Sequence, residues 1–137
     1  MATSTINQPA PWARVASRVG LAIAAIMSTF NVMNGVGTLI DPTFGQLDPT
    51  LAPQPVPISL ALILFGGITL AAIVPAWRGH RGALWTVVLT RLGEAWSALI
   101  LPFLPDAPDG ILVFAILLVT VGTMVAGLVA LGLRRAA

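Results

Sequence analysis

Residues 110–133 read GILVFAILLVTVGTMVAGLVALGL, a stretch without a single charged side chain. An α-helix rises 1.5 Å per residue, so a helix of this length crosses the roughly 30 Å hydrocarbon core of a bilayer. Three apolar stretches of similar length precede it, at residues 19–40, 58–77 and 83–103. The sequence therefore predicts an all-α integral membrane four-helix bundle that forms one transmembrane domain over residues 1–137.

The composition leads to the same class of protein. Of the 137 residues, 57% are hydrophobic and only 9% are charged, and the mean hydropathy is +0.94. A soluble domain carries about 25% charged residues. So few charges cannot cover the surface of a water-soluble globule of this size, and we expect the lipid bilayer to be the main partner of this surface.

The composition also excludes several kinds of chemistry. The chain has no cysteine and no tyrosine, and its single histidine is His80. Disulfides and cysteine-ligated metals are therefore excluded, and one histidine cannot build a bis-histidine haem site within one subunit. We expect no metal site. The pI of about 11.2 comes from arginines whose positions in the membrane explain them, so we expect no nucleic-acid partner.

The charged residues outside the spans separate by sign. Arginines lie before the first span, between the second and third, and after the fourth: Arg14, Arg18, Arg78, Arg81, Arg134 and Arg135. Aspartates lie in the other two connections: Asp41, Asp48, Asp106 and Asp109. The positive-inside rule places the arginine side in the cytoplasm. The expected topology is up-down-up-down, N-in/C-in, with an external loop at residues 41–57. The first apolar run is about twice as long as the h-region of a signal peptide, so we expect it to remain as a span.

The loop at residues 41–57 reads DPTFGQLDPTLAPQPVP and contains five prolines. Such a segment favours folded-back, partly polyproline II structure over regular helix. Phe44, Leu47 and Leu51 can dip into the membrane interface. Two interpretations stay open: a solvent-exposed connector, or a lid over the external end of the bundle.

Small residues recur at four-residue spacing in the first and fourth spans. They are Gly20, Ala24 and Ser28, and Gly122, Ala126 and Ala130. Such ridges allow membrane helices to approach closely. They pack either the four helices of one chain or two copies of it, so a homodimer and a subunit of a larger membrane complex both remain open.

Arg91 and Glu94 are charged residues inside the third span. Arg91 lies about 13 Å from the cytoplasmic end at helical rise, and Glu94 lies one turn deeper. A charge at this depth costs about 2.5–3.5 kcal/mol on insertion scales. Their i, i+3 spacing allows them to pair on one helix face. We therefore expect both side chains to face the bundle interior, a cavity or a partner subunit.

The first span carries a matching polar stripe. Ser28, Asn31, Asn34 and Thr38 recur at three- and four-residue intervals, and Asp41 follows. An asparagine facing lipid would leave its amide unsatisfied in hydrocarbon. The stripe is therefore expected to face Arg91 and Glu94. We assign Arg91 and Glu94 as the candidate catalytic pair. The candidate ligand-binding residues are Ser28, Asn31, Asn34, Thr38, Thr90 and Trp96.

The end of the first span, NGVGTLIDP, resembles the DoxX-like group of small bacterial membrane proteins. Asn34, Gly35, Gly37, Asp41 and Pro42 carry this resemblance, together with the run Arg91-Leu92-Gly93 in the third span. The likeness covers most of the chain in layout but only these residues in detail. It implies a bacterial cytoplasmic (inner) membrane and a link to quinones or redox partners. It carries no catalytic motif onto this chain.

Several functional hypotheses follow. The first is a binding protein, a redox-linked accessory subunit for example, that holds a lipophilic or anionic small molecule at Arg91, Glu94 and the two asparagines. The second is a small membrane enzyme (an isomerase, a cyclase or an epoxide-opening catalyst) with Glu94 as acid or base. The third is an oligomeric proton-coupled transporter. Against all three stands a purely structural pair that fixes helix register. The sequence names no cofactor.

Overall fold

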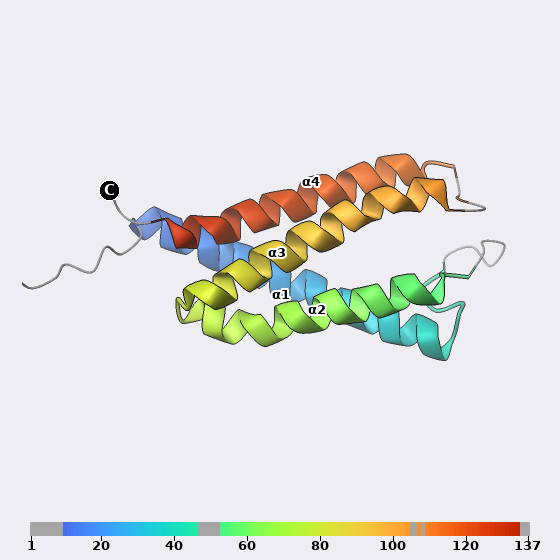
Figure 1. Ribbon diagram of the computed structural model, residues 1–137, viewed down its shortest axis with the longest axis horizontal. Coiled ribbons are helices and arrows are strands. Elements are labelled where there is room, and N and C mark those ends of the chain that lie inside the picture. The colour runs from blue at the N-terminus through green and yellow to red at the C-terminus, as the bar shows by residue number, and fades with distance from the viewer. Residues whose placement is uncertain (1–9, 47–52, 105–106, 108, 135–137) are drawn as a thin grey trace, which may run out of the picture.

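The computed structural model is helical through most of its described residues, which are 10–46, 53–104, 107 and 109–134. Four α-helices follow one another, and two of them continue as short 3-10 segments (Figure 1). The elements are α1 (Pro11–Ile40), α2 (Val56–Trp77), α3 (Arg81–Ser97) with η1 (Ala98–Phe103), and α4 (Ile111–Ala130) with η2 (Leu131–Leu133). Each of the four helices is long and apolar enough to cross a membrane.

Helix α1 begins well before the apolar stretch that predicts it. It starts at Pro11 and not near residue 19. Proline is well tolerated in the first turn of a helix, because the N–H that it lacks would have no partner there. Ala13 and Ser17 lie buried in this extension. The Ser17 hydroxyl donates to the Val129 carbonyl of α4 at 3.1 Å. Contacts with α4, invisible to a hydropathy scan, thus extend the helix.

The third span changes its helix type partway along. Regular α-helix was expected over residues 83–103, but α3 ends at Ser97 and the tighter η1 follows. Pro102 lies inside η1 and has no N–H to donate to the Ala98 carbonyl, so an α-helical turn cannot continue there.

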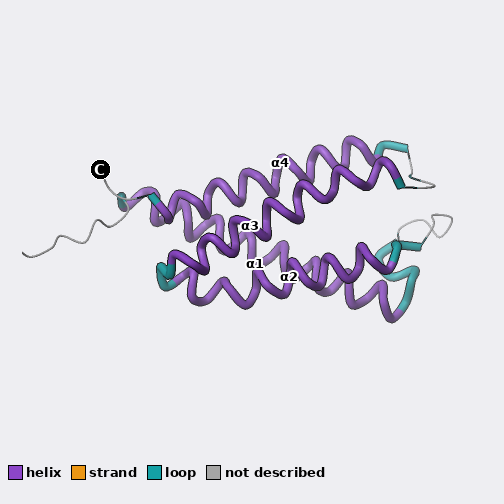
Figure 2. The backbone as a smooth tube through the Cα atoms, viewed as in Figure 1, coloured by secondary structure: helices purple, strands orange, loops and turns teal. Residues whose placement is uncertain are grey.

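The four helices form a ring in which each packs against its two neighbours. Contacts run from α1 to α2, α2 to α3, α3 to α4 and α4 to α1, while α1 and α3 approach each other only locally. Figures 1 and 2 show the connection after α2 at one end of the bundle, together with the ends of the described chain. The connections after α1 and α3 lie at the other end.

The small residues of α1 and α4 pack within one chain. A Cβ at Gly20 would lie 2.8 Å from the Leu128 Cβ, and one at Gly122 would lie 2.5 Å from the Ala95 Cβ. Both distances are too short for a real side chain. The sequence left open whether these ridges pack helices of one chain or of two copies. At Gly20 and Gly122 they pack helices of one chain.

Among the described residues, the main cluster of buried hydrophobic side chains lies in one half of the bundle, the half next to the ends of the described chain. Its buried members come from the first half of α1, the second half of α2, the first half of α3 and the last turns of α4. They are Leu21, Ala24, Ala72, Ala76, Leu84, Val87, Val88, Val125, Ala126 and Val129. We call this the apolar half. The rest of the bundle, which ends at the connections after α1 and α3, is called the polar half.

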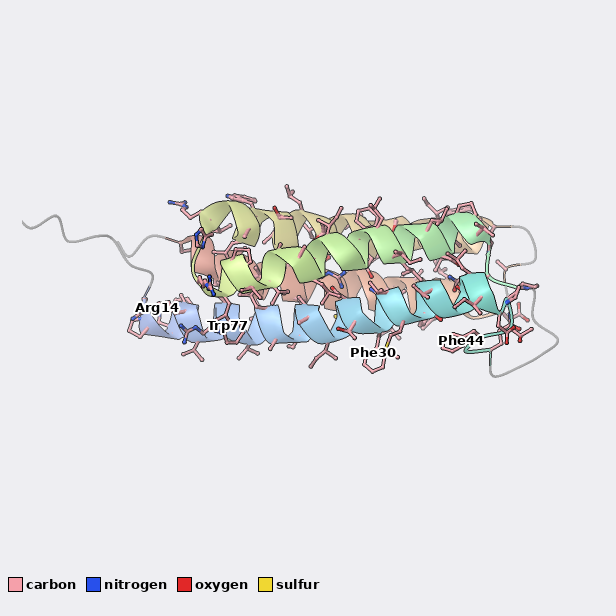
Figure 3. The ribbon with its side chains drawn as sticks, turned by 90° about the horizontal axis from the view of Figure 1, so that it is seen from below. Arg14, Phe30, Phe44 and Trp77 are labelled. Carbon is pink, nitrogen blue, oxygen red and sulfur yellow. The ribbon has the colours of Figure 1, made fainter. Side chains whose placement is uncertain are left out.

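Arginines surround the end of the apolar half. The Arg18 guanidinium lies over the Trp77 ring, 5.7 Å from its centroid, and Arg81 donates to the Leu133 carbonyl at 3.4 Å. Figure 3 shows Arg14 and Trp77 at this end and Phe44 at the opposite one. Arg135, Asp48 and Asp106 lie outside the described residues.

The segment after α1 begins with a tight turn. The Asp41 carboxylate accepts hydrogen bonds from the Thr43 hydroxyl at 2.7 Å and the Thr43 amide at 2.9 Å, and these bonds lower the pKa of Asp41. Phe44 folds back so that its ring packs directly against Gly37 of α1, a site where any larger residue would displace it. Leu47 and Leu51 lie outside the described residues, so the lid hypothesis stays untested for them.

Candidate functional site

Arg91, Glu94 and Asn31 form one hydrogen-bonded group that links α3 to α1. One Glu94 carboxylate oxygen accepts from the Arg91 guanidinium, one helical turn away on α3. The other oxygen accepts from the Asn31 side-chain amide of α1. The structure thus brings together the ion pair and the first asparagine of the stripe. This contact is made where α1 and α3, opposite each other in the ring, approach locally.

The group lies near the middle of the third span. Arg91 is ten residues along from Arg81, about 15 Å at helical rise, in a span that runs Arg81–Phe103. The Arg91 side chain is 1% exposed and that of Glu94 is 16% exposed. A guanidinium this deep cannot extend to either interface, so its charge must be balanced inside the bundle. Glu94 supplies that balance.

Two buried polar atoms near the boundary between the halves have no hydrogen-bond partner among the described residues. They are the Arg91 Nε and the Ser28 Oγ. Ser28 is fully buried and lies one turn before Asn31 on α1. A buried donor left unpaired costs about 1–3 kcal/mol. The Arg91 N–H is therefore a donor available to a bound molecule.

A second hydrogen-bonded group lies farther into the polar half. Asn34 donates to the Gln54 side-chain oxygen at 3.4 Å, and Gln54 donates to the Ser59 hydroxyl at 3.1 Å. Ser59 and Thr38 share a hydrogen bond of 2.8 Å. These residues join the end of α1 to the start of α2. Asn34 and Thr38, both expected at the ligand site, thus belong to a neighbouring group.

Thr90 faces α2 rather than the ion pair. Its hydroxyl shares a 2.7 Å hydrogen bond with Thr69 and also donates to the Thr86 carbonyl at 2.9 Å. Both threonines are buried. The pair ties α2 to α3, so its evident role is helix packing.

Trp96 does not join the interior group. Its side chain is 57% exposed and lies on the outer surface of α3. Two residues along an α-helix correspond to about 200° of rotation, so Trp96 points away from the face that Glu94 occupies. The structure therefore does not bring Trp96 to the interior group, and its role in ligand binding stays a prediction.

Among the described residues, the sequence reasoning missed four interior polar residues: Ser17, Gln54, Ser59 and Thr69. Ser59, Gly66, Thr69, Ala72 and Ala76 are the buried residues of α2. All are small, and their spacing is helical. In a span otherwise built of large aliphatic residues, that pattern was the signal for the inner face.

The arrangement has a definite electrostatic character. Glu94 neutralises the charge of Arg91, so the group has no surplus positive charge with which to hold an anion. What remains free is a donor, the Arg91 Nε–H, and the lone pairs of the Glu94 carboxylate that neither Arg91 nor Asn31 occupies. Such a site suits a neutral molecule with a hydrogen-bond acceptor.

No protein-family model, no curated protein and no solved structure matches this chain. The fold itself defines the class: a four-helix protein whose helices are long and apolar enough to make it a multi-pass membrane protein. The likeness to the DoxX-like group stays a prediction.

Proposed function

We propose that this chain is a ligand-binding protein of the bacterial cytoplasmic membrane. It holds a small lipophilic molecule whose neutral head group, a carbonyl for example, accepts a hydrogen bond from Arg91. Quinones have this chemistry, and the resemblance to the DoxX-like group supports a redox-linked role. Of the lipophilic and the anionic ligand that the sequence left open, we favour the lipophilic one, because Glu94 neutralises the charge of Arg91.

The observation that carries this proposal is the buried Nε of Arg91, which has no hydrogen-bond partner among the described residues although the Arg91–Glu94 ion pair has no net charge. A purely structural ion pair gains most when every donor is satisfied. Placing an arginine near the centre of a span is costly, and leaving one of its N–H groups free adds to that cost. A bound acceptor removes this penalty.

The proposed orientation is N-in/C-in, with the spans running up-down-up-down. The support is the gathering of Arg18, Arg78, Arg81 and Arg134 near one end of the bundle, which the positive-inside rule assigns to the cytoplasm. The Arg18–Trp77 contact places an aromatic ring at the same end, as is typical of a membrane interface.

Mass spectrometry of the protein purified in mild detergent tests the proposal. The wild type should carry a small molecule that the double variant Arg91→Leu/Glu94→Leu lacks. Leu89→Ala is the matched control, because Leu89 lies on the outer face of the same helix and is 60% exposed. The control should keep the ligand. Equal ligand in the wild type and in a well-folded double variant contradicts the proposal.

A small membrane enzyme is the second candidate. The observation that favours it is the geometry of the Glu94 carboxylate. Asn31 donates to one of its oxygens and Arg91 to the other, so the carboxylate is oriented, and its side chain is 16% exposed. An oriented carboxylate with free lone pairs is what a general base requires. Glu94→Gln separates the two candidates. This variant should still bind the molecule in either case, but only an enzyme would then accumulate unconverted substrate.

A further inference from the structure

We propose that water and the head group of the ligand reach Arg91 and Glu94 through the polar half, and that the apolar half closes the bundle toward its other end. The inference rests on the site proposed above, but not on the orientation of the bundle in the membrane. It adds a direction of access to that site.

Polar side chains form a path through the polar half. Gln54 lies just before α2, at the end of the bundle, and contacts Asn34 and Ser59. Asn34 lies one turn along α1 from Asn31, and Asn31 donates to Glu94. Hydrogen-bonding side chains therefore recur at every turn from the end of the bundle to the ion pair.

The exposure of the interior side chains differs between the polar half and the apolar half. Gln54, Asn34, Asn31 and Glu94 are all partly exposed. Beyond Arg91 the interior is sealed, since Leu21 is 1% exposed and Val87 and Val129 are each 0% exposed. A layer of packed aliphatic side chains offers no partner to a water molecule or a proton. Polar molecules are therefore excluded from the apolar half.

The unpaired atoms mark where the path ends. Ser28 Oγ lies one helical turn from Asn31, and Arg91 Nε lies one turn from Glu94, the two deepest members of the path. The apolar core begins one turn before Ser28 on α1, at Ala24. Polar groups that lack protein partners at the inner end of a polar path are the expected binding point for a head group or a water molecule.

Single cysteines test the direction of access, because the chain contains no native cysteine. Asn34→Cys and Asn31→Cys probe the path, and Ser28→Cys is a near-isosteric replacement at its inner end. Gly82→Cys marks the end of the bundle at the apolar half, where an added Cβ meets nothing within 4 Å. Asp109→Cys marks the opposite end. Each variant is treated with a negatively charged, membrane-impermeant thiosulfonate in right-side-out and in inside-out membrane vesicles.

Two further variants serve as matched controls. Met33→Cys lies at the depth of Asn34 but on the outer face, since Met33 is 57% exposed, and lipid surrounds it in the membrane. Ala24→Cys lies in the apolar core. A thiol in hydrocarbon does not ionise, and only the thiolate reacts. We expect both controls to react at least about tenfold more slowly than Asn34→Cys.

The expected result is that the path cysteines react in the vesicles in which Asp109→Cys reacts, and not in those in which Gly82→Cys reacts. Reaction from the Gly82 side overturns the inference. Protection from both sides overturns it as well, and so does a rate at Asn34→Cys equal to that at Met33→Cys. Purified protein without any ligand would contradict the proposed function but would leave this labelling pattern unchanged, so the two failures are distinguishable.

Discussion

Replacing Glu94 by leucine leaves the Arg91 guanidinium in the bundle without its carboxylate. The substitution is conservative for the helix, since leucine and glutamate have similar helix propensities. Its effect on stability therefore measures the loss of the negative charge. The reverse variant, Arg91→Leu, leaves Glu94 with the Asn31 amide as a remaining partner.

The two single variants should differ in how strongly they destabilise the protein. Removing one partner of a buried ion pair costs about 3–5 kcal/mol. The Arg91 side chain is 1% exposed and would lose its only hydrogen-bond partner among the described residues, whereas Glu94 is 16% exposed and keeps Asn31. Glu94→Leu should thus lie near the upper end of that range and Arg91→Leu near the lower end. At about 1.4 kcal/mol per tenfold change, the folded-to-unfolded ratio falls by roughly two to three and a half orders of magnitude.

Reversible unfolding in mixed detergent micelles measures these free energies, with Leu89→Ala as the control for an outer-face change. The double variant removes both charges, and apolar replacement of a whole buried pair is often neutral or stabilising. It should therefore be at least as stable as either single variant. Single variants within about 0.5 kcal/mol of the control, or a larger loss for Arg91→Leu than for Glu94→Leu, would refute the reasoning.

Three further predictions concern other parts of the chain. Reporter fusions at the C-terminus should report cytoplasm and fusions within residues 41–57 the outside; an external C-terminus would contradict the orientation. Gly122→Val should lower the melting temperature more than Gly127→Val, because a Cβ at Gly122 would collide with α3 while one at Gly127 meets nothing within 4 Å; equal melting temperatures would show that the close approach is unimportant. The Thr43 hydrogen bonds lower the pKa of Asp41, so its contribution to stability is present above the unfolded pKa of about 3.9 and is lost as pH falls through the lower folded value. Asp41→Asn should weaken that acid dependence in thermal unfolding, and an unchanged pH profile would contradict the assignment.

The fold class was predictable because hydropathy depends only on local sequence. Each span is a run of apolar residues long enough to cross hydrocarbon, and the structure has a helix at every one of them. The ends were less predictable. The start of α1 depends on contacts with α4, and the end of α3 depends on a proline that changes the helix type. Neither follows from hydropathy.

The candidate site was predictable in its centre but not at its edges. A costly charge pair and an asparagine stripe must face inward, and the structure brings Asn31 to Glu94. Which residues of the stripe reach the pair depends on how the helices cross, and sequence does not give that angle. Asn34 and Thr38 therefore turned out to contact Gln54 and Ser59 instead. The outward position of Trp96 could have been predicted by counting the helical rotation from Glu94.

Because Arg91 and Glu94 lie one turn apart on the same helix, their pairing does not wait for the other spans. The third span is the least hydrophobic of the four, with a mean hydropathy of 1.3 against 1.6 to 2.6 for the others. During biosynthesis its two charges can neutralise each other while the segment is still passing through the translocon. By then the first span, made earlier, already offers Asn31 within the bilayer. An arginine paired across two helices would instead have to enter the lipid alone.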